Sequence, residues 1–257
     1  MNKRFFSTAA TEGKEKIGMT DEKNSAIMPL LRANGIRRCF LLKAFLILMS
    51  ASAIFMMIWL YIIRDRFSYR TYMIVPLSVI HVLYGIFTVK IFAFAESGMQ
   101  AQSKGAMSLY GAVFFMPVLY RIYALLLKCR PATVFDTFTV GMIFTLICAR
   151  VNCFISGCCL GKIVPGTQAR WPTRELEILY YLILMEVMIF RIRKRKAKGE
   201  LYPVYMISYG VFRFMLEFFR ESGKTGIFHN AHYWSALSVL IGVIALLRVI
   251  HKNKKGV

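Results

Sequence analysis

The sequence predicts an all-α, polytopic membrane protein with about seven transmembrane helices. Of 257 residues, 57% are hydrophobic and the mean hydropathy is +0.53, which places the chain among membrane proteins rather than soluble domains. The apolar residues form segments of about twenty, the length an α-helix needs to cross a hydrocarbon core of about 30 Å. Lys and Arg number 34 against 13 Asp and Glu, an excess typical of cytoplasmic loops and of contact with anionic lipid head groups.

The chain is expected to have three parts. Residues 1–37 are polar, with few periodic apolar positions, and predict a poorly ordered tail. A transmembrane domain follows at 38–251, and a basic cytoplasmic tail at 252–257. The first apolar run starts near Leu41 and is too deep and too long for a cleaved signal peptide. The expected spans are 41–63, 73–95, 105–127, 134–156, 175–192, 201–219 and 233–250.

Loop charge predicts an orientation, because short loops rich in Lys and Arg stay cytoplasmic. The segment RIRKRKAKGE after the fifth span is strongly basic. Placing it inside also puts 64–70, the loop after the third span and the carboxyl-terminal tail inside, with 96–104 and 220–232 outside. Odd parity then sends the amino terminus outside, in conflict with the basic flank of the first span. Because the basic residues separate apolar runs and do not form one face, no nucleic-acid partner is expected.

The sixth span carries ionisable residues, which are functional candidates because a charge inside a span costs at least about 2.5–3.5 kcal/mol. Tyr209, Arg213, Glu217 and Arg220 are spaced i, i+4, i+8 and i+11, which confines them to one stripe of a helix. The alternative is an Arg213–Glu217 pair that only neutralises itself while holding helices together.

Two further spans deliver polar groups to the same depth. With the predicted orientation, Arg213 lies roughly 10 Å from the outer end of its span. Arg150 lies in the outer third of the fourth span, and Tyr110 about five residues, or roughly 8 Å, inside the third. Arginine presents a planar fork of N–H groups that suits phosphate. Arg150 and Arg213 therefore predict a site for a phospholipid head group in the outer leaflet.

The segment VNCFISGCCLGKIVPG follows Arg150 and contains Gly157, Gly161 and Gly166. Irregular backbone at membrane depth is tolerated where it is buried in protein or lines a polar cavity, so this segment predicts a wall of the site. An ordinary helix end with glycine caps is the alternative. Cys153, Cys158 and Cys159 lie in the same segment, as small buried hydrophobes, as a disulfide pair, or as a catalytic thiolate. A metal is not expected, because no His or second cysteine pair is near in sequence.

Four segments resemble, in order, the signature segments of prolipoprotein diacylglyceryl transferases. In ARVNCFISGCCLGK, the positions Arg150, Phe154, Gly157 and Gly161 match that family. AMSLYGAV (106–113) resembles its Met-Ser-Phe-His-Gly-Gly-Leu, and RWPTRELE (170–177) its Arg-His-Pro-Ser-Gln-Leu-Tyr-Glu. YGVFRFMLEFFRE (209–221) resembles its Tyr-Gly-x-x-Arg-Phe-x-x-Glu-Phe-x-Arg and is the most specific match. The resemblance covers about residues 100–250.

The resemblance implies a multi-pass enzyme of the bacterial plasma membrane, with its site toward the outer leaflet and no cofactor. Such an enzyme transfers diacylglycerol from phosphatidylglycerol to the thiol of a lipobox cysteine in a prolipoprotein, releasing glycerol phosphate and leaving a thioether. The partners are phosphatidylglycerol, the prolipoprotein signal peptide and membrane lipids. The implied catalytic residues are Arg150, Arg213, Tyr110, Tyr209 and Glu217. The implied substrate-binding residues are Arg150, Arg213, Arg220, Ser156, Gly157, Gly161, Cys153, Cys158 and Glu177.

The sequence departs from the family at three positions. The family's His in the third span is Tyr110, its Asn is Cys153, and its signature Glu is Cys158. A neutral His accepts a thiol proton near pH 7, whereas a tyrosine with a pKa of about 10 does so poorly. His81 lies in a span and is interpreted as a packing residue. Two alternatives stay open: a transferase of the same fold with a different acceptor, and a non-enzymatic protein that binds or transports anionic lipid.

Overall fold

The computed structural model describes residues 38–66, 71–99, 107–194, 198–221 and 228–255. The predicted tail at 1–37 lies outside the described residues. The chain divides into two compact units, Met1–Leu46 and Ile47–Val257. In the first unit the described residues 38–46 are helical. The second unit contains the rest of the first helix and all the helices that follow.

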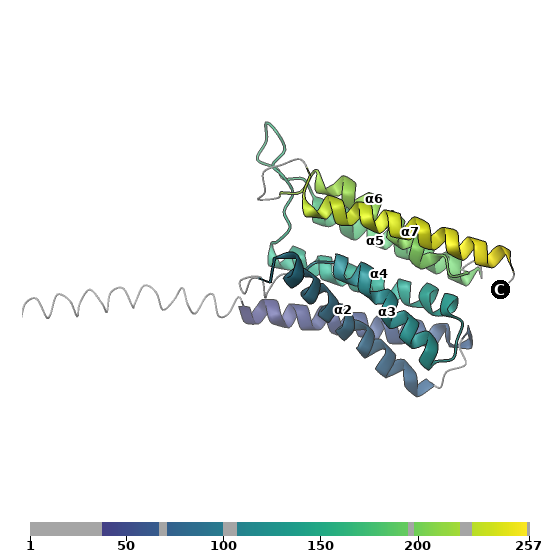
Figure 1. The fold of residues 1–257 in the computed structure, drawn as a ribbon. Coiled ribbons are helices and arrows are strands. Elements are labelled where there is room, and N and C mark those ends of the chain that lie inside the picture. Colours follow the sequence, from purple (N-terminus) through teal and green to yellow (C-terminus); the bar gives the residue numbers. More distant parts are fainter. Residues whose placement is uncertain (1–37, 67–70, 100–106, 195–197, 222–227, 256–257) are drawn as a thin grey trace, which may run out of the picture. The chain divides into compact units, whose positions relative to one another are not determined.

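The expected all-α architecture is confirmed, and each predicted span coincides with a helix (Figure 1). Two 3-10 turns, η1 (Arg64–Arg66) and η2 (Thr71–Met73), precede the second helix. Within the described ranges no strand is present, and there are only isolated β-bridges. The helices are Arg38–Ile62, α2 (Ile74–Glu96), α3 (Tyr110–Leu126), α4 (Pro131–Ser156), α5 (Thr173–Arg193), α6 (Leu201–Glu217) and α7 (Asn230–Lys254).

The helices differ in how well they suit a membrane. Among the described residues, Arg38–Ile62, α4, α7 and the stretch Thr71–Glu96 that contains α2 are long and apolar enough to cross one. Helices α3 and α6 have 17 residues each, which is about 25 Å at 1.5 Å per residue. Helix α5 is long enough but carries charges at both ends. The less apolar helices, α5 and α6, supply most of the polar site described below.

Helices α6 and α7 lie side by side in contact (Figure 1). A Cβ on Gly210 would lie 2.6 Å from the Ser235 carbonyl oxygen, and one on Gly242 would lie 2.8 Å from Ile207 Cγ1. The Ser238 hydroxyl donates to the Met206 carbonyl at 2.9 Å. Small residues and a hydroxyl therefore let the two backbones approach closely, as at helix interfaces in membranes.

Helix α4 is largely buried and fixes its neighbours through polar contacts. The Trp59 indole donates to the Thr137 carbonyl at 3.0 Å. The two carboxylate oxygens of Asp136 accept the backbone N–H groups of Gly199 and Leu201, at 2.6 and 2.9 Å. Asp136 thereby satisfies N–H groups that the start of α6 leaves without intrahelical partners. The acidic residue has a structural role at the end of α6 opposite Arg213.

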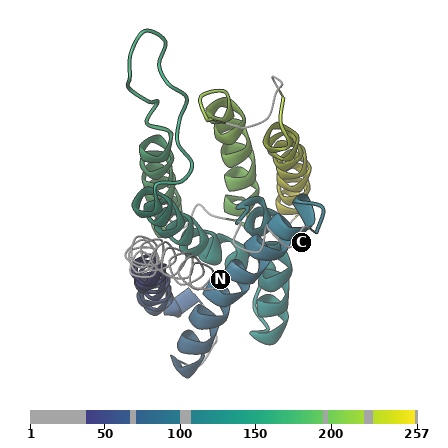
Figure 2. The same cartoon turned by 90° about the vertical axis from the view of Figure 1, so that its left-hand side faces the viewer.

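The segment between α4 and α5, residues 157–172, projects from the helices (Figure 2). Helix α4 ends at Ser156 and is capped by Gly157, whose φ of 73° lies in the left-handed region that glycine adopts without strain. Gly161 then pairs with Arg220 in an antiparallel bridge. The Lys162 N–H donates to the Phe219 carbonyl at 2.8 Å. The segment is thus fastened to the chain just after α6.

Two expectations about the ends of helices were wrong. Tyr110 is the first residue of α3, and not about five residues inside, because the preceding residues 107–109 are not helical. Arg220 does not continue the stripe of α6, because that helix ends at Glu217 and Arg220 enters the bridge with Gly161. Arg213 accordingly lies four residues from the end of its helix.

Candidate active site

A buried network of charges joins α4, α5 and α6. Arg150 Nε lies 2.8 Å from Glu177 Oε2, and Arg213 NH1 lies 3.1 Å from Glu177 Oε1. Arg213 NH2 reaches Glu217 Oε2 at 2.8 Å, and Arg220 NH1 lies 4.0 Å from the same oxygen. Glu177 therefore bridges the two arginines that the sequence singled out, and a single chain of ion pairs connects five residues, from Arg150 to Arg220.

These groups lie at one level because of where each helix begins or ends. Arg150 precedes the end of α4 by six residues, and Arg213 precedes the end of α6 by four. Glu177 follows the start of α5 by four residues. At 1.5 Å per residue these offsets are about 9, 6 and 6 Å. The two arginines, which the sequence predicts at a common depth, thus lie in one network, and Glu177 joins them.

The network is almost completely removed from solvent. Arg150, Arg213 and Glu177 are 4%, 3% and 2% exposed. Isolated buried charges would cost several kcal/mol each, so mutual pairing is what permits their burial. Three arginines against two glutamates leave a formal excess of one positive charge. Such a site is suited to an anionic ligand, which would have to share the arginines with Glu177 and Glu217.

Several polar atoms beside the network have no hydrogen-bond partner among the described residues. They include Nε of Arg213. The hydroxyls of Tyr181, Tyr205 and Tyr209 are also buried without a partner. An unmade buried hydrogen bond costs about 1–3 kcal/mol. These donors are therefore available to a ligand that enters the site.

Tyr110 contacts the site but its hydroxyl is engaged. Its ring packs edge-on against Tyr209, with centroids 5.8 Å apart. The hydroxyl donates to the Ala231 carbonyl at 2.9 Å and lies 2.7 Å from Ser235 Oγ. Tyr110 thus ties α3 to α7 at the position where the family has its His. Both oxygen partners come from α7, and neither was identified from the sequence.

Ser156, Gly157 and Gly161, which were predicted to bind substrate, have structural contacts at the end of α4 and just after it. The Ser156 hydroxyl donates to the Asn152 carbonyl within its own helix, and Gly157 closes that helix. A Cβ on Gly161 would collide with the Trp171 carbonyl, so this glycine allows close backbone approach. The Ser156 hydroxyl therefore does not contact the arginine network. Gly161 approaches it only through its backbone bridge with Arg220.

Three sulfurs lie next to Arg150. The Sγ atoms of Cys153, Cys158 and Cys159 are within 4.8 Å of one another, and Arg150 NH1 lies 4.0 Å from Cys159 Sγ. The pKa of the Cys159 thiol is held well below its usual range by hydrogen bonds from the other two thiols, and nearby Arg220 and Arg150 lower it further. A negative charge on this sulfur is therefore favoured.

Two histidines are buried among aromatic rings, and only His81 was singled out from the sequence. His81 is buried between Tyr120 and Phe138, which agrees with its interpretation as a packing residue. His232 in α7 is equally buried, and its ring contacts Phe218 at a centroid distance of 4.8 Å. Its Nε2 has no hydrogen-bond partner in the described part of the chain. The signal for it was the His-x-x-His spacing at the start of the last span, where His232 Nδ1 accepts the His229 N–H.

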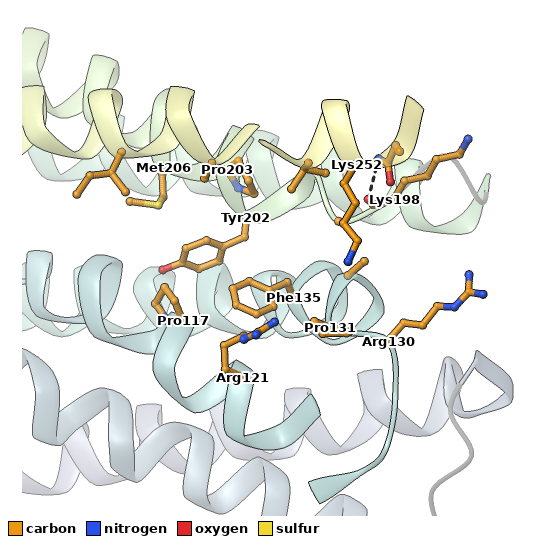
Figure 3. A pocket seen from close by; sticks show the side chains of 16 residues that line it. Pro117, Arg121, Arg130, Pro131, Phe135, Lys198, Tyr202, Pro203, Met206 and Lys252 are labelled. Carbon is orange, nitrogen blue, oxygen red and sulfur yellow. Dashed lines mark hydrogen bonds between the residues drawn. The ribbon is translucent and has the colours of Figure 1, made fainter. Parts of the chain in front are cut away.

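A separate cavity of about 750 Å³ lies toward the opposite ends of the helices, between α3, α4, α6 and α7 (Figure 3). Its walls include Pro117, Phe135, Tyr202 and Met206. Four cations also line it, and within the described residues none of them has an ion-pair partner: Arg121, Arg130, Lys198 and Lys252. Apolar walls with unpaired cations suit an anionic amphiphile.

The fold and the network define an α-helical, multi-pass membrane protein with a buried arginine–glutamate site. Comparison with known proteins identifies its family: the family model of prolipoprotein diacylglyceryl transferase matches residues 44–248. The chain belongs to this family, and the resemblance predicted from its motifs is confirmed.

The curated relatives are divergent. One phosphatidylglycerol–prolipoprotein diacylglyceryl transferase, from Clostridium tetani, is 26% identical over 110 residues, which cover 37% of this chain and 44% of the relative. A second, from Clostridium perfringens, is 24% identical over 157 residues, or 55% and 61% of the two chains. A third, from Pseudoalteromonas translucida, is 27% identical over 165 residues, or 58% and 62%. The chain thus spans about half the length of the curated relatives it matches.

Proposed function

We propose that this protein transfers the diacylglyceryl group of phosphatidylglycerol to the lipobox cysteine of a prolipoprotein. The observation that carries the proposal is the buried network in which Glu177 holds Arg150 and Arg213 together. The family match over residues 44–248 supports it, as do the names of the curated relatives.

The charge of the network fits the proposed reaction. The acceptor thiol loses its proton to water, its sulfur forms a bond to the glyceryl carbon, the bond from that carbon to the phosphate oxygen breaks, and glycerol phosphate leaves. The phosphate changes from a diester with one negative charge to a monoester with up to two. Arginines fixed beside that phosphate stabilise the charge as it develops. The unpartnered Nε atom of Arg213 and the Tyr209 hydroxyl are the donors in this proposal, and Arg150 adds its positive charge beside Glu177.

The proposal places the site toward the outer leaflet. Basic residues gather at the opposite helix ends, after α3, after α5 and at the end of α7. Cytoplasmic ends of spans carry such an excess. The network, near the ends of α4 and α6 and the start of α5, then faces outward. A prolipoprotein already translocated across the membrane would present its lipobox cysteine on that side.

Two observations favour other candidates. The Tyr110 hydroxyl is committed to Ala231 and Ser235, which favours a transferase whose acceptor needs no base at that position. The cavity lined by Arg121 and Lys252 favours a protein that holds an anionic lipid without transferring it. The first alternative keeps the phosphate site, and the second does not require it.

The test is transfer by the purified protein in phosphatidylglycerol vesicles, with a lipobox peptide as acceptor and mass spectrometry to detect the thioether. Arg150→Ala and Arg213→Ala should each reduce the rate by about 100–1,000-fold, the effect of removing a donor to a developing oxyanion. Arg248→Ala is the matched control, because that arginine is exposed on α7 and should leave the rate unchanged. Full activity in both site variants would refute the proposal, and lipid binding with no thioether would favour the lipid-binding alternative.

A further inference from the structure

Three thiols converge where the chain leaves α4. Cys153 belongs to the last turn of that helix, and Cys158 and Cys159 follow the left-handed turn at Gly157. Cys159 itself has a φ of 60°, a conformation that costs a non-glycine residue of order 1–3 kcal/mol. The turn brings all three Sγ atoms within 4.8 Å of one another. The strained backbone of Cys159 thus lies within the cluster of three sulfurs, two residues beyond the helix cap at Gly157.

The chemistry of the proposed reaction excludes a covalent role for these thiols. If one of them attacked the glyceryl carbon, it would form a thioether, whose carbon–sulfur bond has no leaving group activated for the next step. The diacylglyceryl group would remain on the protein. A disulfide would engage only two of the three sulfurs. A role for all three sulfurs must therefore be something other than covalent catalysis or a disulfide.

Three thiolates are the donor set of a soft or borderline cation such as Zn²⁺. Tetrahedral zinc with bonds of about 2.3 Å holds its sulfurs about 3.8 Å apart, so contraction by about 1 Å would close the cluster. Zn²⁺ with three thiolates carries a net charge of −1. Arg150, whose NH1 lies 4.0 Å from Cys159 Sγ, supplies both a compensating charge and an N–H donor to sulfur, as outer-shell partners do.

We infer that Cys153, Cys158 and Cys159 form a three-thiolate site for Zn²⁺, and that the thiol of the acceptor cysteine is its fourth ligand. In the described part of the chain, no fourth His, Cys, Asp or Glu joins the group. Three protein ligands with one open position are the arrangement of catalytic zinc. No metal was expected from the sequence, because the cysteines are not spaced as two pairs.

The second half of this inference rests on the proposed function. A thiol that binds zinc loses its proton to water, and the resulting thiolate attacks the glyceryl carbon while glycerol phosphate departs. The zinc neither gains nor loses electrons. The site thus supplies an activated thiolate in a chain whose residue at the family's His position is Tyr110, with a hydroxyl bound to α7. It also lies directly beside the arginine that the proposal assigns to phosphate.

Metal content tests the site without reference to activity. The full-length protein, purified under reducing conditions and dialysed against zinc, should retain one Zn²⁺ per chain by elemental mass spectrometry. Cys153→Ser and Cys159→Ser should each weaken zinc binding by more than the roughly 10–100-fold that loss of an outer-shell partner costs. Cys129→Ser is the control, since Cys129 is half-buried outside the cluster and should bind zinc as the parent does. Absence of zinc from the reduced parent protein, or a Cys153 disulfide found on peptide mapping of the unreduced protein, would overturn the site.

Cobalt substitution tests the open position. Co²⁺ bound to the cluster should show thiolate-to-cobalt charge-transfer absorption, and a lipobox peptide should increase it, whereas the same peptide with Ser in place of Cys should not. An unchanged spectrum with the cysteine peptide would overturn the role as fourth ligand while leaving the metal site. If the metal binds and no thioether forms with any acceptor, the proposed function fails separately from the zinc site.

Discussion

Glu177 is the residue whose replacement should disturb the network most. It is 2% exposed and contacts both Arg150 and Arg213. Glu177→Gln keeps the shape and one acceptor oxygen but turns an N–H₂ group toward one of the guanidinium groups. Removing one partner of a buried ion pair costs about 3–5 kcal/mol. A retained hydrogen bond to a charged group offsets about 1.5–3 kcal/mol, so the net loss should be about 2 kcal/mol.

For a chain of this size about 2 kcal/mol corresponds to a lowering of Tm by about 4–8 °C. Thermal unfolding of the protein in detergent micelles measures it. The control is Glu175→Gln, because Glu175 lies in the same helix with its side chain 46% exposed and exposed ion pairs contribute little. Transfer should also fall by roughly 10–100-fold, because both arginines lose the group that positions them. Equal Tm values for the two variants would refute the assignment of Glu177 as the centre of the network.

Three further substitutions separate the structural contacts from the proposed chemistry. Gly161→Ala should lower both Tm and transfer, because its Cβ would collide with the Trp171 carbonyl, whereas Gly85→Ala has open space and should be neutral or stabilising in a thermal scan. Asp136→Asn should lower the free energy of unfolding by about 1–3 kcal/mol, seen as a lower Tm, because an amide N–H₂ group then faces the N–H of Gly199 or Leu201. Transfer should be retained at a temperature where the variant is folded, and its loss there would contradict the placement of Asp136 at the far end of α6. Tyr110→Phe should reduce the transfer rate by less than the roughly 100-fold expected of a lost proton acceptor, and a larger loss in a folded variant would show that the hydroxyl takes part in proton transfer.

The helices were predictable because apolar runs of about twenty residues have few other structures in a membrane. Their ends were less so. Residues 107–109 before Tyr110 were predicted to be helical, yet α3 begins at Tyr110. Arg220 kept the helical spacing, but backbone pairing with Gly161 took it out of α6. In both cases a pattern of side chains did not reveal a competing backbone arrangement.

The arginines of the site were predictable from the cost of burying charge. The pair of Arg213 with Glu217, one turn away in the same helix, was also predictable. The contacts of Arg150 and Arg213 with Glu177 were not, because they depend on how α5 packs. The cysteine cluster was similarly hidden. Its sulfurs meet only because the chain reverses at Gly157, and the spacing alone resembled no metal motif. The face of α7 that packs on α6 could have been recognised from its small residues, which are Ser235, Ser238 and Gly242.

The most direct test of the proposed transfer is to express the protein in bacteria depleted of their own lipoprotein transferase. Mass spectrometry of a reporter lipoprotein should then find a diacylglyceryl adduct on its lipobox cysteine. The adduct should disappear when Arg150 and Arg213 are both replaced by Ala and the variant still inserts in the membrane. An unmodified cysteine beside well-inserted parent protein, or an adduct that persists with the double variant, would contradict the proposal.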